Sequence, residues 1–478
     1  MKKGKGLLLL ILAAAQFIVI LDGSIVNVAL SSIMQGLGFT PENLQWVVTS
    51  YILAFGGFLL LGGRAADLFG RKRIFLIGLI GFTLGSLLAG IAQNEVMMIV
   101  ARAIQGITAA FMSPAALSII LTEYKEGPER NKALGVWGAV GAGGAAAGLI
   151  IGGLLTEYLG WRWDFMVNLP IGVALIILAI KYVPAHHSEA EHSDLDLFGA
   201  LFVTSGLMTL VYGLTSAPDW GWTSLSTVAW IGSALVLLGA FIFNELKVKH
   251  PLVDFGIFRI RNLTGANLTQ LFISSGLMSM FFFVSLYLQN ILHFKPVETG
   301  LAFLPFAVTV GITATQASRF IGRFGYKPFL VGGPLVMAMG LFMLSHISVD
   351  GSYFAVVLPA LILMAIGGGL TFISVSVAAT SGVPQDEAGL ASGLLNTSQQ
   401  IGGALGLAIL SGVAATSAHN AITTGVQAAT VTGYHSALIV ASLFAIAASI
   451  VSFIVIKQKK GSQSAEAPIG TITQVSID

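Results

Sequence analysis

The sequence predicts an all-α integral membrane protein, built as two six-helix pseudo-repeat bundles plus an inserted helix pair, with 14 transmembrane helices in total. Three observations lead to this fold class. Hydrophobic residues make up 55% of the 478 residues and charged residues only 10%, whereas a soluble domain carries about 25% charged residues. Apolar segments long enough to cross a bilayer recur along the whole chain. The basic residues lie almost entirely in every second connection between those segments.

The composition also excludes several classes of function. The formal net charge is +2 and the basic residues are scattered along the chain, so no nucleic-acid partner is expected. The absence of cysteine excludes disulfides, thiolate metal sites and cysteine nucleophiles. The apolar segments hold no cluster of metal ligands or nucleophiles, and the sequence contains no sizeable polar domain. We therefore expect neither an enzyme nor a sensor, and no cofactor or metal.

The predicted spans are continuous and apolar, which favours helices over the alternating strands of a membrane β-barrel. The first span follows Met1–Lys5 and holds three consecutive alanines, so a cleaved signal peptide is the alternative there. Because the apolar run continues past the alanines to Leu21, we expect an uncleaved first span. The spans fall at residues 7–30, 44–64, 74–94, 97–121, 133–156, 163–183, 197–217, 225–246, 263–291, 299–320, 328–347, 353–380, 390–416 and 434–456.

The distribution of lysine and arginine orients these spans. With the N-terminus on the inner side, the 24 basic residues all lie on that side except Arg162 and Lys295, which lie outside, and Arg102, which lies within a span. One missed helix would invert half of the loops, so the asymmetry supports the span assignment. We expect a multi-pass protein of the cell membrane with both termini cytoplasmic.

Asp22 lies inside the first span, where a carboxylate is costly and by default marks function. At about 1.5 Å per residue, Asp22 lies roughly 22 Å from the inner face, and Arg102 of the antiparallel fourth span lies roughly 8 Å from the outer face of a core about 30 Å thick. The two side chains are therefore expected at the same depth. They form either a static ion pair or a site where Asp22 exchanges a proton. Gln105, one turn beyond Arg102, hydrogen-bonds into this site or to a neighbouring helix.

The connection Gly63–Arg73 concentrates one acid and four bases between two spans. Asp67 is predicted to accept hydrogen bonds from a helix N-terminus of the other bundle. Arg71 is predicted to reach Glu123, at the inner end of the fourth span. Such contacts form in one conformation and break in another, so we expect a conformational switch, in addition to a role in orientation. The residues concerned are Gly63, Asp67, Gly70, Arg71 and Glu123.

Gly144, Gly148 and Gly152 recur every four residues in the fifth span and form one stripe on a helix. Stripes of small residues let membrane helices approach closely. We expect a neighbouring helix to pack closely there. We also expect this smooth helix face to slide or to form a seal as the protein changes between two conformations.

The two halves of the chain repeat each other. Phe69–Lys72 returns as Phe324–Lys327 between two spans, and glycine-rich spans occur at 135–153 and 389–406. The expected organisation is therefore an N-terminal bundle over 1–183, a linker and inserted helix pair over 184–262, a C-terminal bundle over 263–460 and a disordered tail over 461–478. The linker holds three histidines that could bind a metal, although a solvated linker is expected: His186, His187 and His192.

Aromatic, methionine and amide side chains near the middle of the spans are candidates for binding bulky apolar ligands between the bundles. Taken singly, each also fits helix packing or lipid contact. The candidates are Phe17, Phe55, Phe111, Met112, Trp137, Asn267, Gln270, Phe282, Tyr287, Phe306, Phe372, Asn396 and Gln399.

Several of these stretches match motifs that occur together in one family of transporters. Gly63–Arg73 is similar to G-x-L-x-D-x-x-G-R-K/R-x, with alanine in place of the leucine. Leu21–Leu30 is similar to L-D-x-S/T-I/V-V-N-V-A-L, and Arg102–Gly106 matches R-x-x-Q-G. Trp161–Trp163 and Asn168–Gly172 look like a sixth-helix signature. Together these motifs resemble the major facilitator superfamily, specifically its fourteen-helix drug:proton antiporters.

The chain departs from that family pattern at two positions. In the motif G-x-x-x-G-P-x-x-G-G, present as Gly144–Gly153, Leu149 stands in place of the proline, which implies a weaker kink. Asp164 stands where the family branch usually has an apolar residue near the outer face. It is either a solvated acid at the end of a loop or a second proton site. The tenth span, 299–320, lacks the acid that some relatives exporting divalent cations carry, which implies neutral, monovalent or zwitterionic substrates.

The resemblance implies a proton-coupled multidrug efflux transporter that exports amphipathic small molecules, antibiotics among them, by alternating access. Asp22 and Arg102 are its expected proton-coupling residues. A proton-coupled carrier of one specific metabolite or nutrient is the alternative. The expected partners are a small-molecule substrate, protons and the lipid bilayer, and a monomer is expected to suffice.

Overall fold

The computed structural model describes residues 3–125, 127–185, 195–384 and 387–458. All regular secondary structure in these residues is helical, and 14 segments are long and apolar enough to cross a membrane. The predicted fold class, an all-helical membrane protein with fourteen spans, is therefore confirmed. The helices are α1 (Lys3–Leu37), α2 (Pro41–Leu44), α3 (Trp46–Phe69), α4 (Arg71–Gly90), α5 (Glu95–Glu123), α6 (Pro128–Tyr158), α7 (Arg162–Met166), α8 (Asn168–Tyr182), α9 (Leu197–Trp220), α10 (Leu225–Lys247), η1 (Phe255–Arg259), α11 (Arg261–Asn290), α12 (Pro296–Ala302), α13 (Leu304–Phe324), α14 (Lys327–Leu344), η2 (Tyr353–Val357), α15 (Leu358–Thr380), α16 (Ala388–Asn420), η3 (Ile422–Thr424) and α17 (Val426–Val455).

Each predicted span overlaps one of these segments, but the ends differ. The sequence predicts that the first span stops at residue 30 and that the last begins at 434, whereas α1 continues to Leu37 and α17 begins at Val426. The added turns contain polar side chains such as Gln35 and Gln427. Hydropathy falls there while backbone hydrogen bonding continues, so the helices extend beyond their apolar runs.

The repeated turn of the sequence has a glycine with a positive φ in both halves. Gly70, between α3 and α4, has φ +93°, and Gly325, between α13 and α14, has φ +76°. Glycine adopts this left-handed region without the steric penalty of a Cβ. Each turn can therefore join two antiparallel spans within one or two residues.

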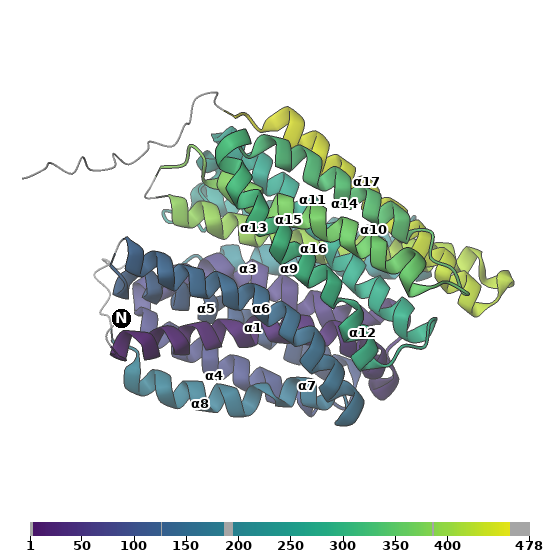
Figure 1. The fold of residues 1–478 in the computed structure, drawn as a ribbon, viewed down its shortest axis with the longest axis horizontal. Coiled ribbons are helices and arrows are strands. Elements are labelled where there is room, and N and C mark those ends of the chain that lie inside the picture. Colours follow the sequence, from purple (N-terminus) through teal and green to yellow (C-terminus); the bar gives the residue numbers. More distant parts are fainter. Residues whose placement is uncertain (1–2, 126, 186–194, 385–386, 459–478) are drawn as a thin grey trace, which may run out of the picture.

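The helices of each half pack mainly on one another (Figure 1). α1 packs against α6, and α5 contacts both α3 and α4, whereas α11 packs against α16 and α17 and α15 against α13 and α14. The halves meet where α3 contacts α16 and α6 contacts α12, and α9 packs against α3 and α16 with α10 on its outer side. We propose that 1–183 and 263–460 are two bundles that move as units around the linker and inserted helix pair of 184–262. His186, His187 and His192 and the tail 461–478 lie outside the described residues.

The glycine stripe of α6 lies against α1. A Cβ at Gly148 would lie 2.9 Å from the backbone oxygen of Leu21, and one at Gly152 would lie 3.1 Å from that of Ile25. A Cβ at Gly144 would lie 3.3 Å from the Phe17 ring. The stripe thus has the predicted packing role, and it fixes the part of α1 that carries Asp22. Its role in sliding stays a prediction.

Candidate functional site

Asp22 and Arg102 form a buried ion pair. The Arg102 guanidinium donates from Nη1 to Asp22 Oδ2 at 2.5 Å. The exposed fractions are 0% for Asp22 and 1% for Arg102, so neither charge is solvated. Such a pair is stable only when geometry and further hydrogen bonds offset the desolvation of both charges.

Polar neighbours supply those further hydrogen bonds. Arg102 Nε donates to the Val47 carbonyl at 2.9 Å, and its Nη1 also donates to Gln105 Oε1 at 2.8 Å. Gln105 Nε2 donates to Asp22 Oδ1 at 3.0 Å, and Asn168 Nδ2 donates to the same oxygen at 3.1 Å. Both amides also reach Ser86 Oγ, at 2.7 and 3.2 Å. The acid therefore accepts three hydrogen bonds, one of them from a cation.

Sequence reasoning places Gln105 in this site but misses Asn168 and Ser86 as its members. Asn168 belongs to a motif that the sequence does single out, so a signal was present. Ser86 is one small polar residue in an apolar span, and nothing in its spacing distinguishes it.

The close approach of α5 to α3 depends on Gly106, where a Cβ would lie 2.3 Å from the Tyr51 carbonyl oxygen.

Aromatic rings enclose the guanidinium. Its Cζ lies 4.3 Å from the centroid of the Tyr51 ring and 5.7 Å from that of Phe165. Rings at this distance stabilise a cation through their quadrupole. The Tyr51 hydroxyl is buried and has no hydrogen-bond partner among the described residues. Tyr51 and Arg102 both line the adjoining cavity.

A cavity of about 1310 Å³ extends from this pair to the end of the molecule that carries Gly63–Arg73, which we call the loop end. Tyr51, Arg102 and Gly23 line its inner part, whereas Asp22 does not reach its wall. Arg64, Asp67 and residues 249–252 line its mouth. The volume exceeds that of a typical drug-sized pocket, about 300–1,000 Å³.

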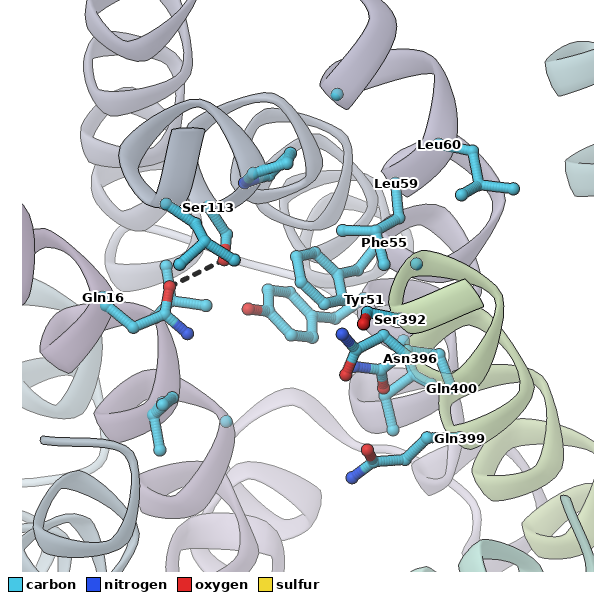
Figure 2. Close-up of a pocket in the computed structure, with 18 of the residues that line it drawn as sticks. Gln16, Tyr51, Phe55, Leu59, Leu60, Ser113, Ser392, Asn396, Gln399 and Gln400 are labelled. Carbon is cyan, nitrogen blue, oxygen red and sulfur yellow. Dashed lines mark hydrogen bonds between the residues drawn. The ribbon is translucent and has the colours of Figure 1, made fainter. Parts of the chain in front are cut away.

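The walls of the cavity combine aromatic rings with neutral amides. Figure 2 shows the α16 side chains Ser392, Asn396, Gln399 and Gln400 on one wall, and Gln16 and Ser113 on the other. The Ser113 hydroxyl donates to Gln16 Oε1 at 2.7 Å. The Tyr51 and Phe55 rings lie between the two walls (Figure 2). Amides both donate and accept hydrogen bonds, so this lining fits amphipathic ligands without requiring a particular charge.

Six of the thirteen predicted ligand-binding residues line cavities. Phe55, Trp137, Asn396 and Gln399 line the large one. Gln270 and Phe372 line a pocket of about 160 Å³ beside it, which Asn396 and Gln399 share.

The other seven residues were predicted to line the cavity, but they do not. Asn267 is held by bonds to Ser398 and to the Leu263 carbonyl, and the Tyr287 hydroxyl donates to the Ser348 carbonyl. Met112 and Phe282 are buried in helix contacts. Composition cannot tell which face of a mostly apolar helix meets a cavity, because all faces are apolar. The residues that line neither cavity are Phe17, Phe111, Met112, Asn267, Phe282, Tyr287 and Phe306.

The Gly63–Arg73 connection makes contacts within its own half and with the inserted pair. Arg71 donates to Asp67 Oδ1 at 3.2 and 3.3 Å and to the Thr122 hydroxyl, next to the predicted partner Glu123. Arg64 donates to the carbonyls of His250 and Pro251 at 3.2 and 3.1 Å. Asp67 shares the cavity wall with Gly389 at the start of α16. A switch role for these residues stays a prediction.

At the opposite end, the far end, the two halves are joined by hydrogen bonds between α1 and α11. Ser31 Oγ donates to Asn290 Oδ1 at 2.7 Å, and Gln289 Nε2 donates to the Val28 carbonyl at 2.7 Å. Ser285 Oγ donates to the Asn27 carbonyl at 2.5 Å. Because helices of both halves meet here, the conformation is closed at the far end and open at the loop end.

The model of the Major Facilitator Superfamily matches residues 12–407. The chain belongs to this superfamily. The puromycin resistance protein pur8 of Streptomyces alboniger is 42% identical over 443 residues, which cover 92% of this chain and 88% of that protein. The cephamycin export protein CmcT of Amycolatopsis lactamdurans is 37% identical over 405 residues, which cover 84% of this chain and 83% of that protein.

Solved structures of Major Facilitator Superfamily transporters share the fold. The POT family transporter PepTSo has a TM-score of 0.69 at 16% identity, covering 95% of this chain and 98% of that chain. A bacterial homologue of the human lysosomal transporter Spinster, in an inward-facing and unoccupied conformation, has a TM-score of 0.68 at 14% identity, covering 95% of this chain and 97% of that chain. At these identities the likeness shows the fold alone.

The two departures from the superfamily motifs have different consequences in the structure. Helix α6 runs from Pro128 to Tyr158 without interruption at Leu149, whose side chain lines the cavity. Asp164 is 0% exposed, so the interpretation as a solvated loop acid is wrong. The acid lies on the short helix α7, which packs against α1, α4 and α6.

Proposed function

We propose that this chain exports amphipathic small molecules, antibiotics and other drugs among them, in exchange for protons, by alternating access between the two bundles. One observation carries the proposal: Arg102 lines the cavity on one side and binds the buried Asp22 on the other. A ligand in the cavity therefore contacts the residue that neutralises the Asp22 carboxylate. The resistance and export relatives support the direction of transport and the class of substrate.

The coupling follows from the charge balance of the pair. Ionised Asp22 offsets the charge of Arg102, and a proton on Asp22 leaves a buried cation with only neutral partners. An unpaired buried charge is costly, so proton binding favours a conformation in which Arg102 moves to water or to another acceptor. The Tyr51 ring lies against the guanidinium and lines the cavity beside it, so a ligand that displaces this ring would change the same contact. Proton and ligand thus act on one equilibrium.

The charge distribution supports an orientation with the loop end and both termini in the cytoplasm of a cell-membrane protein. Arg64, Arg71 and Lys72 cluster at the loop end, where they contact 250–251, α3, α5 and the Ile180 carbonyl. In this orientation the cavity is open to the cytoplasm, the compartment from which an exporter collects its substrate. A monomer contains every residue of this site.

The test uses the purified chain in proteoliposomes with an imposed pH gradient. A panel of structurally unrelated compounds that includes puromycin and a cephamycin is assayed for uptake, and proton movement is followed with a pH-sensitive dye. We expect several compounds to be transported, each driving proton movement, and Asp22→Asn to abolish the coupling. Asp219→Asn is the matched control, because Asp219 is an exposed acid at the end of α9.

Two outcomes would contradict the proposal. Unchanged coupling in Asp22→Asn would remove this carboxyl from the mechanism. Transport of one compound alone out of the panel would favour the carrier of one specific metabolite or nutrient.

A further inference from the structure

Asp164 is a second fully buried carboxyl beside the Asp22 cluster, and the mechanism above does not use it. Its Oδ2 accepts a hydrogen bond from the Thr156 hydroxyl at 2.5 Å. Its Oδ1 is buried without any hydrogen-bond partner among the described residues. Within the same residues, no lysine, arginine or histidine lies within 4.0 Å of this carboxyl.

This environment favours the neutral acid. An ionised carboxylate away from water needs a cation or several donors, and Asp164 has one neutral donor. A protonated carboxyl needs only one acceptor for its O–H. Asn168 Oδ1 is such an acceptor, since it too is buried and unpartnered.

The helix geometry connects this acid to Asp22. Asp164 and Asn168 are four residues apart, and Val167 between them keeps helical angles of −60° and −27°, with its N–H bonded to the Trp163 carbonyl at 3.0 Å. Residues with this spacing lie on one helix face, one above the other. Asn168 in turn donates to Asp22 Oδ1 at 3.1 Å. The amide therefore stands between two carboxyls.

The charged groups on the neighbouring helices do not neutralise Asp164. Arg162 of α7 donates to the Ala92 carbonyl at 2.7 Å and lies over the Trp161 ring. Glu157 of α6 accepts from the Val297 N–H at 3.2 Å. Arg102 of α5 lies across the Phe165 ring, and Asp22 of α1 is itself an acid. The basic residues of α4 and α8 lie at their loop ends.

Asp164 lies near the far end of the molecule, whereas the cavity opens at the loop end. The cavity extends from the loop end as far as Tyr51 and Arg102, the partner of Asp22. Asp164 does not line the cavity, and it follows the far-end loop residue Gly160 by four residues, about one helical turn. A proton that enters from the far end would meet Asp164 before Asp22.

We propose that Asp164 is a second proton-binding carboxyl, which holds a proton while Asp22 is ionised against Arg102 and passes it to Asp22 when the far end opens. In that step the O–H bond of Asp164 breaks, an O–H bond forms on Asp22, and the negative charge moves from Asp22 to Asp164. Arg102 is then released from its partner. The inference rests on the proposed proton coupling, and it adds a route from the far end.

Infrared difference spectroscopy of the full chain in lipid tests this without any substrate. We expect the wild-type protein at neutral pH to show a protonated-carboxyl C=O band that Asp164→Asn removes. Thr156→Val keeps the acid but removes its donor, so it should shift the same band, and it serves if Asp164→Asn fails to fold. Because the two acids interact, Asp22→Asn should change the proton affinity of Asp164 about tenfold, which moves the midpoint of the band's pH titration by about one unit. The control Asp219→Asn should leave that midpoint unchanged.

The inference is overturned if Asp164 gives no protonated band at neutral pH, or if Asp22→Asn leaves its proton affinity unchanged. A merely structural buried acid could give the band but would not respond to Asp22. Failure here is distinguishable from failure of the proposed function, because transport in proteoliposomes is measured separately.

Discussion

The interdependence of Asp22 and Arg102 gives the sharpest prediction on stability. Asp22→Asn leaves the guanidinium buried with two neutral acceptors, the Val47 carbonyl and Gln105 Oε1. Arg102→Met leaves the carboxylate with the neutral donors of Gln105 and Asn168. Breaking a buried ion pair by removing one partner costs about 3–5 kcal/mol. Because each remaining charge keeps hydrogen bonds, we expect each single variant to lose about 3 kcal/mol of unfolding free energy, the lower end of that range.

The double variant Asp22→Asn/Arg102→Met removes both charges together. Replacing a whole buried pair by neutral side chains is often nearly neutral, so the double variant should lie within about 1 kcal/mol of the wild-type protein. The predicted coupling energy is then about 5 kcal/mol, well above the roughly 0.5 kcal/mol scatter of independent sites. Proton-coupled transport should remain absent, which separates stability from mechanism.

The assay is reversible unfolding in mixed detergent micelles, followed by helical circular dichroism for the four proteins of the cycle. Asp219→Asn controls for the chemical change at an exposed position. Additive destabilisation, with the double variant about 6 kcal/mol less stable than wild type, would refute the reasoning, because each side chain would then act alone.

Three further predictions concern other parts of the molecule. Gly148→Leu should destabilise the chain by about 1–3 kcal/mol, since even a Cβ there lies 2.7 Å from that of Ser24, while Gly143→Ala, with nothing within 4 Å, should stay within about 0.5 kcal/mol in the same unfolding assay. Tyr51→Phe should weaken the binding of a transported ligand about fivefold, worth about 1 kcal/mol, without lowering the thermal midpoint; unchanged affinity by fluorescence titration would exclude the hydroxyl as a ligand contact. The hydrogen bond and charge of Lys5 hold the pKa of Glu129 below its ordinary 4.5, so their pair stabilises fully above pH 4.5 and loses that effect as the pH falls through the lowered value. Glu129→Gln should flatten the change in unfolding midpoint between about pH 5 and about pH 3, and an unaltered acid dependence would contradict this.

The site was only partly predictable from the sequence. Asp22 and Arg102 stand out because charge is rare in an apolar span, and antiparallel spans convert sequence distance into depth. Asn168 and Ser86 escape such reasoning, because uncharged polar residues are common in membrane helices. Asp164 could be singled out, but its burial could not be foreseen near a loop. For the cavity, Tyr51, Gln16 and Gln400 line the walls without having been predicted, whereas Tyr287 and Met112 point elsewhere.

The sequence alone determined that the protein lies in a lipid bilayer, how many times it crosses the bilayer, and at what depth the charged pair lies. Those properties follow from hydropathy and from the rise of a helix, which are local and one-dimensional. The rotation of each helix about its axis was decided only by tertiary packing, and with it the aromatic and amide walls, the closed far end and the seclusion of Asp164. In lipid all faces of a helix can be apolar, so hydropathy does not mark the face that meets a neighbour, and contacts such as Gly148 on Leu21 fix it instead.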